Sequence, residues 1–240
     1  MTGPQYLLAL VVTALSGVGW LLYFRWKDRA RPEPAWLMAA GAGGGAVAVL
    51  LALLGYAFAG AAGAETSWEK LQSTTLTAAA MAALRVGVVE EVPKLLVVLP
   101  IALWAHAFDE VLDGIVYAAC SALGFATAET VWLLSHGDWE LTHALGRAVA
   151  GPLTHALLAA PWGLGLSMAL LRKRWAALPL GLALSVTAHG AYDLLLARPD
   201  MPPVVSAFVV LILWVWFLRT APRLEREAPV VRAPPDALKP

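Results

Sequence analysis

Residues 88–100 read VVEEVPKLLVVLP, a run of valine and leucine that is interrupted by Glu90, Glu91 and Lys94. A charge near the centre of a lipid bilayer costs at least about 2.5 kcal/mol, so charged side chains in membrane helices normally face a protein interior or a water-filled cavity. Three charges within five positions therefore predict the functional centre of a membrane helix.

The composition of the whole chain agrees with a membrane protein. Of its 240 residues 60% are hydrophobic and 14% are charged, and 11 are tryptophan, which excludes an ordinary soluble domain. We expect an all-α, polytopic transmembrane bundle in contact with the lipid bilayer. The net charge of zero gives no reason to expect a nucleic-acid partner, and the single cysteine excludes an intramolecular disulfide.

Seven membrane spans are expected from the apolar segments between polar or basic turns. Their approximate limits are 6–24, 35–61, 67–104, 111–135, 143–171, 175–197 and 204–218. The segment 67–104 has three interpretations: one very long helix, two spans, or an interfacial piece followed by a span. Either of the last two would give eight helices. Residues 1–219 are expected to form a single transmembrane helical domain. Residues 220–240, rich in Pro, Arg and Glu, are expected to be a disordered cytoplasmic tail.

The basic residues predict the orientation in the membrane. They cluster after the first span at 25–31, after the fifth span at 172–174, and after the last span. If 67–104 crosses once, all three clusters fall on the same side, which the positive-inside rule assigns to the cytoplasm. We therefore expect the N-terminus outside and the C-terminus in the cytoplasm.

The same topology predicts that polar groups from four spans lie at one depth. With a helical rise of about 1.5 Å per residue, each lies roughly 20–27 Å from the cytoplasmic end of its span. The groups are Glu90 with Glu91, Glu129, His155 and His189. Asp113 falls instead near the cytoplasmic mouth of its span.

Spacing within the helices suggests how these groups pair. Glu90 and Lys94 are four positions apart in the favoured orientation for an ion pair, which would leave Glu91 free. His189 and Asp193 are one turn apart, so that Asp193 could orient the imidazole. Glu129 stands alone, and a structural hydrogen bond and a role in the site are both open. No serine-hydrolase or HExxH motif is present, so water is the expected nucleophile.

Taken together, the polar motifs resemble the PrsW family of bacterial intramembrane proteases, which is related to the CAAX prenyl endopeptidases and to bacteriocin-immunity membrane proteins. The resemblance covers about 84–196 and implies that this range is the catalytic core of the transmembrane domain. In chain order its motifs are Glu90-Glu91-x-x-Lys94, Asp113-Gly114 with Tyr117, Leu123-Gly124-Phe125-Ala126 leading to Glu129, then His155, and His189-x-x-x-Asp193.

The resemblance implies an endopeptidase of the plasma (inner) membrane that cleaves a membrane-anchored protein or peptide, such as an anti-sigma factor. Glu90 and Glu91 match the essential glutamate pair, and His155 and His189 match the family's histidines. Four further residues are assigned supporting roles: Lys94, Asp113, Glu129 and Asp193.

Two chemical mechanisms stay open at this point. In one, His155 and His189 with a glutamate bind Zn²⁺; in the other, no metal takes part, a glutamate activates water and the histidines stabilise the oxyanion.

Two other functions are also open. A proton- or solute-coupled transporter would string the same residues along the membrane normal, whereas a protease needs them to converge. A catalytically silent membrane binding or immunity protein would keep the fold without the reaction.

Overall fold

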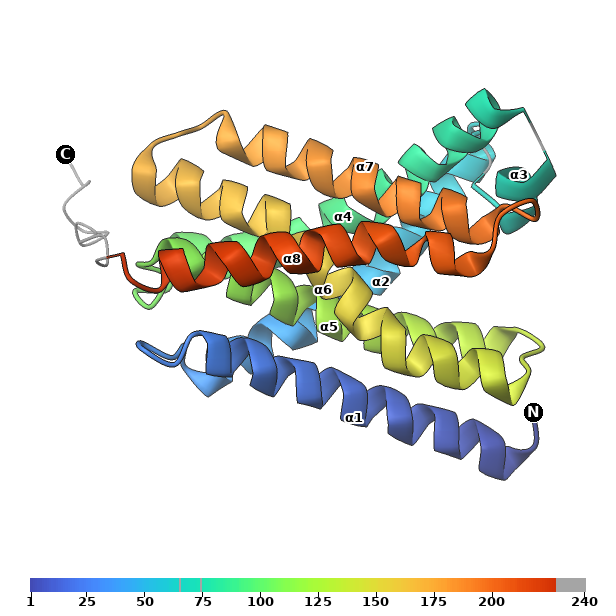
Figure 1. Cartoon of the computed structure of the whole chain (residues 1–240), viewed down its shortest axis with the longest axis horizontal. Helices are drawn as coiled ribbons and strands as arrows, with labels where there is room; N and C mark the ends of the chain where they lie inside the picture. The colour runs from blue at the N-terminus through green and yellow to red at the C-terminus, as the bar shows by residue number, and fades with distance from the viewer. Residues whose placement is uncertain (65, 74, 228–240) are drawn as a thin grey trace.

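A computed structural model describes residues 1–64, 66–73 and 75–227, and this part of the chain is all-α (Figure 1). The predicted polytopic helical bundle is confirmed. The elements are α1 (Gly3–Lys27), α2 (Ala35–Ala61), α3 (Trp68–Ser73), α4 (Leu76–Trp104), α5 (Val111–His136), α6 (Leu141–Arg172), α7 (Ala177–Ala197), η1 (Pro203–Val205) and α8 (Ala207–Leu224).

Six segments are long and apolar enough to cross a membrane: α1, α2, α5, α6, α7 and Pro203–Leu224, which contains α8. At 29 residues α4 is about 43 Å long, enough to cross as well. α4 is not among the six because it is less apolar: it carries four charged residues, Arg85 and the three in 90–94. With α4 included, the described residues contain the seven long helices that the sequence predicts.

The segment 67–104 is one short helix and one long helix. α3 has six residues, and α4 begins after Thr75, whose side-chain oxygen accepts a hydrogen bond from the backbone N–H of Ala78 and so caps the helix. The predicted single crossing is therefore α4, and the shorter α3 accounts for the eighth helix.

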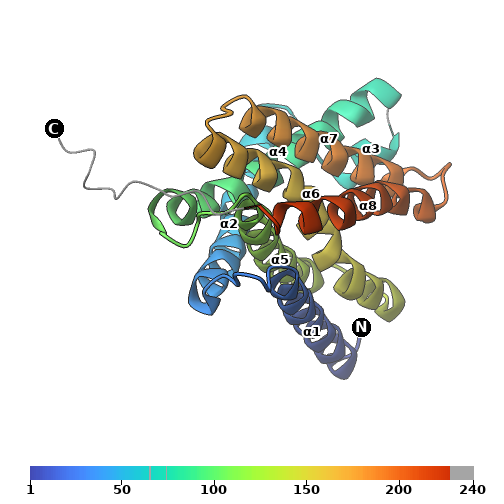
Figure 2. The same cartoon turned by 60° about the vertical axis from the view of Figure 1, so that its left-hand side comes forward.

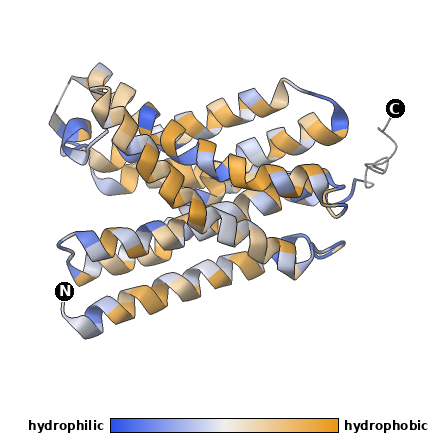
Figure 3. Cartoon of the chain, turned by 180° about the vertical axis from the view of Figure 1, so that it is seen from behind, coloured by the Kyte–Doolittle hydropathy of each residue, from blue (hydrophilic) through white to orange (hydrophobic). Residues whose placement is uncertain are grey.

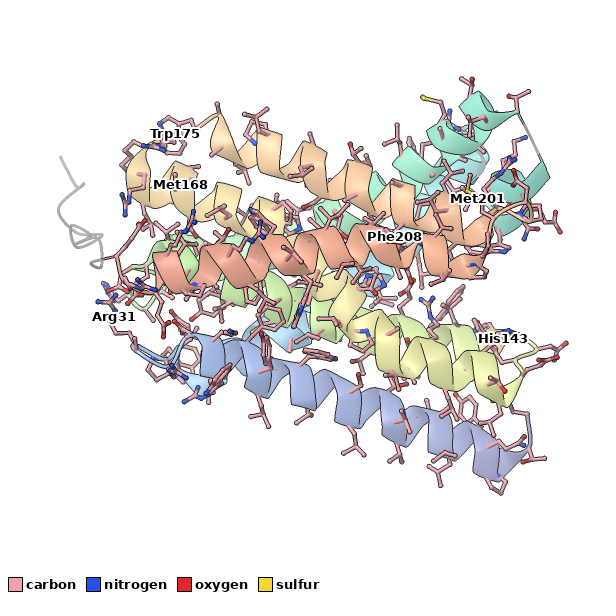
Figure 4. The ribbon with its side chains drawn as sticks, in the orientation of Figure 1. Arg31, His143, Met168, Trp175, Met201 and Phe208 are labelled. Carbon is pink, nitrogen blue, oxygen red and sulfur yellow. The ribbon has the colours of Figure 1, made fainter. Side chains whose placement is uncertain are left out.

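The helices run between two opposite ends of the molecule. α1 begins at one end and α8 finishes at the other (Figure 1). Arg31, after α1, and Trp175, after α6, lie at one end, whereas His143 and Met201 lie at the opposite end (Figure 4). The two internal basic clusters thus share an end, as predicted; that this end is cytoplasmic stays a prediction. Of the predicted tail, residues 220–224 belong to α8, and residues 228–240 lie outside the described part of the chain.

The centre of the bundle is the pair α5 and α6. α5 packs against α6 and α2, and α6 also packs against α7 and α1 (Figure 2). Hydrophobic residues cover the bodies of the helices and hydrophilic residues gather at the loops (Figure 3), as expected where the outer surface meets lipid.

Small residues allow the central helices to approach each other closely, because a side chain at these positions would meet the neighbouring backbone. A Cβ atom at Gly45 of α2 would lie 1.8 Å from the carbonyl oxygen of Ser121 in α5, and one at Gly124 would lie 1.8 Å from that of Ala42. By contrast, a Cβ at Gly43 meets nothing within 4 Å.

This difference predicts opposite outcomes for two neighbouring substitutions. Gly45→Ala should destabilise the purified protein by about 1–3 kcal/mol, because α2 and α5 must separate to admit the methyl group. Gly43→Ala, the matched control, should leave stability unchanged or raise it slightly. Thermal unfolding of both variants in detergent is the measurement, and equal midpoints would contradict the close packing of α2 on α5.

Candidate active site

Three helices bring five polar side chains together inside the bundle. α4 contributes Glu90, Glu91 and Lys94, α6 contributes His155, and α7 contributes His189; each is at most 7% exposed. The two imidazole rings lie edge to face with their centroids 5.3 Å apart. The predicted convergence of residues from different spans is therefore present.

Glu91 is the hub of the hydrogen bonds. Its Oε1 accepts from Lys94 Nζ at 2.9 Å and lies 2.7 Å from His189 Nδ1, while Oε2 accepts from the indole N–H of Trp162 at 2.9 Å. Both oxygens of this fully buried carboxylate are thus engaged, and it ties α4 to α6 and α7.

Glu90, unlike Glu91, has only one of its two carboxylate oxygens in a hydrogen bond. Its Oε1 accepts a hydrogen bond from the Tyr56 hydroxyl of α2 at 2.7 Å, but its buried Oε2 has no hydrogen-bond partner. That oxygen lies 3.5 Å from His189 Nε2, 3.6 Å from Lys94 Nζ and 3.9 Å from His155 Nδ1. The expectation that Glu91 would be left free is therefore wrong. Lys94 also lies within ion-pair distance of Glu90, but it hydrogen-bonds to Glu91, and the uncommitted oxygen belongs to Glu90.

The orientation of His189 also differs from the expectation. Asp193 Oδ2 lies 3.6 Å from His189 Nε2, too far for a hydrogen bond, whereas Glu91 holds Nδ1. With Nδ1–H donating to Glu91, Nε2 points toward Glu90 and Asp193. The imidazole is thus oriented by a carboxylate on another helix, and Asp193 faces the same side of the ring as Glu90.

His155 bridges Lys94 and Glu129. Its Nδ1 lies 2.9 Å from Lys94 Nζ, and its Nε2 lies 3.3 Å from Glu129 Oε2. Because an ammonium can only donate, Nδ1 accepts and Nε2 carries the proton toward Glu129. Glu129 is not solitary, since it also pairs with Arg147 at 2.7 Å. It belongs to the edge of the site.

Lys94 has no exposed surface, and its ammonium lies 4.1 Å from the centroid of the Phe125 ring. A buried cation is stable only where fixed partners replace its hydration. Here the two carboxylates, the ring of Phe125 and His155 Nδ1 do so.

Asp113 is the one predicted supporting residue that lies elsewhere. It sits in the first turn of α5, near Asp28 and Glu33 of the loop after α1. Along α5 it is 16 residues, or about 24 Å, from Glu129. The structure therefore separates it from the Glu90 site.

Three residues of the site were not predicted: Tyr56, Trp162 and Arg147. Each is a polar group in an apolar helix, and a partner on another helix was the missing information. For Arg147 a signal was available, because an arginine inside a membrane helix normally pairs with an acidic residue facing it.

A family model described as "PrsW family intramembrane metalloprotease" matches residues 33–219. The chain belongs to the PrsW family. The matched region includes α2 to α7 and most of α8, and so every residue of the site described above.

Individual relatives agree with this assignment. The chain is 37% identical to Protease PrsW of Bacillus subtilis (strain 168) over 125 residues, which are 49% of this chain and 55% of the relative. It is 33% identical to Protease PrsW of Geobacillus kaustophilus (strain HTA426) over 160 residues, 65% of this chain and 70% of the relative. The chain thus spans little more than half the length of the first relative. No solved structure matches it significantly.

Glu90, His155 and His189 could also hold a metal ion, since one ligand atom of each lies within 4.8 Å of the others. The uncommitted Glu90 Oε2 and His189 Nε2 are suitable donors, and the Glu91 hydrogen bond to Nδ1 is the usual outer support of a metal-bound histidine. The donor set therefore fits zinc, with Lys94 beside it as a competing cation.

The Lys94 network makes a stability prediction. Lys94→Met keeps the length of the side chain but leaves two buried carboxylates without their cation, and should cost about 3–5 kcal/mol. Arg85→Met, an exposed cation on the same helix, is the matched control and should change little. Unfolding midpoints in detergent test this. A Lys94→Met protein as stable as the control would contradict a structural role for the ammonium.

Proposed function

We propose that this PrsW-family protein is an intramembrane endopeptidase that hydrolyses a peptide bond of a membrane-anchored substrate with water activated by Glu90. The observation that carries the proposal is the buried Glu90 Oε2, which has no hydrogen-bond partner and faces the imidazoles of His155 and His189. A carboxylate oxygen held in this way is available to a water molecule.

Glu90 acts as the general base. Oε2 accepts a proton from water as the water oxygen attacks the scissile carbonyl carbon, and the same proton is then passed to the leaving amide nitrogen. Tyr56 fixes Oε1, so that Oε2 keeps its direction during both transfers. Glu91 cannot take this role in the observed arrangement, because both of its oxygens accept hydrogen bonds.

His189 faces the developing negative charge. Its Nε2 lies on the same side as Glu90 Oε2, and in the protonated state this nitrogen can donate to the oxygen of the tetrahedral intermediate. His155, held between Lys94 and Glu129, positions the ammonium and closes the other side of the site. Glu91 is a positioning residue that fixes both Lys94 and His189.

In an alternative form, zinc bound by Glu90, His155 and His189 would supply a Lewis acid that polarises the scissile carbonyl and acidifies the attacking water. Glu90 Oε2 would then be a ligand, so its role as the general base belongs to the metal-free form. Binding would require the His155 Nδ1 lone pair to turn from Lys94 to the ion. The residues that orient the donors, Tyr56 on Glu90 and Glu91 on His189, are the same with or without the ion.

The surroundings support a membrane-anchored substrate. An open apolar pocket of about 520 Å³ lies between α6, α7 and α8, and its lining includes Thr154 and Tyr192, the residues that precede His155 and Asp193 in the sequence. An apolar segment of a membrane-anchored protein, such as an anti-sigma factor, fits this environment better than a soluble peptide does.

The convergence also weighs against a transporter. A proton relay would place its titratable groups along the path across the membrane, whereas here three groups approach one oxygen atom within 3.9 Å. A catalytically silent protein would have no need to keep that oxygen uncommitted.

Reporter cleavage tests the proposal. Purified protein in detergent is incubated with a panel of single-span peptides, and Glu90→Gln should lower the rate by at least about 10³-fold while the unfolding midpoint stays near that of the wild type. Glu69→Gln, an exposed glutamate in α3, is the matched control and should cleave normally. Wild-type rates in the folded Glu90→Gln protein would overturn the assignment of the base.

Metal content is tested separately from activity. Elemental analysis of protein purified without added metal distinguishes the two forms. Close to one zinc per chain in the wild type, with a large loss in His189→Ala because that variant removes a donor, would make Glu90 a ligand and overturn its assignment as the base. Zinc absent from an active wild type would leave the metal-free mechanism as the one this site uses.

A further inference from the structure

The other end of α5 carries a second buried cluster of carboxylates. Asp28 and Glu33 belong to the loop between α1 and α2, and Asp113 to the first turn of α5. Each is at most 3% exposed, and one oxygen of each lies within 4.8 Å of the others. Three like charges buried this close are unstable unless something positive lies between them.

Part of this arrangement is explained by the local backbone. Asp28 Oδ2 accepts the N–H of Glu33 at 3.0 Å, which closes the loop. Asp113 Oδ2 accepts the N–H groups of Asp109 and Glu110 at 2.8 and 2.6 Å, which caps α5. The Tyr117 hydroxyl donates to Glu33 Oε2.

One carboxylate oxygen of this cluster has no hydrogen-bond partner. Asp113 Oδ1 is buried and has no hydrogen-bond partner. The cap on Oδ2 fixes the carboxylate, so that Oδ1 is the atom free to face Asp28 and Glu33. A buried acceptor without a donor calls for a proton or a cation.

The three arginines nearest in sequence do not supply that cation. At the end of α1, Arg25 Nη1 donates to the backbone carbonyl of Glu33 at 2.6 Å. In the loop, Arg29 lies 5.0 Å from the centroid of the Trp26 ring, and Arg31 pairs with Glu110 and with the carbonyl of Glu227. The printed contacts of these guanidinium groups in the described residues are thus with groups other than the three carboxylates.

We propose that Asp28, Glu33 and Asp113 bind a hard divalent cation, Ca²⁺ or Mg²⁺, which fastens the loop after α1 to the N-terminus of α5. An all-carboxylate donor set selects such ions over zinc or copper. Two ligands of one ion can lie at most about 4.6–5.2 Å apart for Ca²⁺ and about 4.0–4.2 Å for Mg²⁺. The observed limit of 4.8 Å admits Ca²⁺ as the side chains stand.

This site is independent of the proposed protease chemistry. It lies about 24 Å along α5 from Glu129, which borders the Glu90 site. The ion would act on stability by joining the ends of α1, α2 and α5, and a loss of binding here leaves the Glu90 site intact.

The test uses the full-length chain in detergent, stripped of metal with a chelator and then titrated with CaCl₂, MgCl₂ or MnCl₂. Thermal unfolding reports stabilisation, and the electron paramagnetic resonance of Mn²⁺ reports occupancy. Asp28→Asn removes one charge, while its amide oxygen can still accept the Glu33 N–H. Asp138→Asn, an exposed aspartate in the loop at the opposite end, is the matched control.

We expect the wild type and Asp138→Asn to unfold at higher temperature with added cation, and Asp28→Asn to need at least about tenfold more cation for the same shift. Glu90→Gln should keep the wild-type response, which separates this site from the protease site. The proposal is overturned if no cation stabilises the wild type, or if Asp28→Asn responds like the control. It is also overturned if the cation-induced shift is lost in Glu90→Gln alone. A third contrary outcome is a wild type that lower pH stabilises and cations do not, because a proton shared by Glu33 and Asp113 then explains the cluster.

Discussion

The burial of one ammonium group is the constraint on which the structure depends. Lys94 has no contact with solvent, so its charge must be balanced inside the bundle. Glu91 provides the hydrogen-bonded counter-charge and is itself held by Trp162 of α6 and His189 of α7. A requirement of electrostatics within one helix thereby fixes the positions of two others.

Close helix packing makes this network possible. Hydrogen bonds of 2.7–2.9 Å between side chains on three helices require backbones that are near each other and rigid. Small residues permit that approach, for α2 on α5 at Gly45 and Gly124 and for α4 on α7 at Gly87, where an added Cβ would meet the carbonyl oxygen of Val186 at 2.4 Å. The carboxylate that the network leaves uncommitted, Glu90, is then available for chemistry.

The two ends of α5 illustrate two ways of handling buried acids. At Glu129 the carboxylate forms an ion pair with the Arg147 guanidinium and also faces the Nε2–H of His155. At Asp113 the neighbouring arginines contact other groups, and no ion pair to this carboxylate is found in the described residues. The first charge is thus balanced by a side chain of the protein, and the lack of such a partner at Asp113 is the reason to look for an ion.

The sequence by itself determined the class of fold, the number of long helices and the charged residues and histidines that α4, α6 and α7 bring together. Span length and charge placement are local properties, and a common depth in the membrane follows from helical rise alone. Only the tertiary structure decided which glutamate is uncommitted and that Asp113 belongs to another cluster. Pairing of this kind depends on Tyr56, Trp162 and Glu33, which come from other helices and loops at no fixed spacing from their partners, so no pattern along one helix can reveal it.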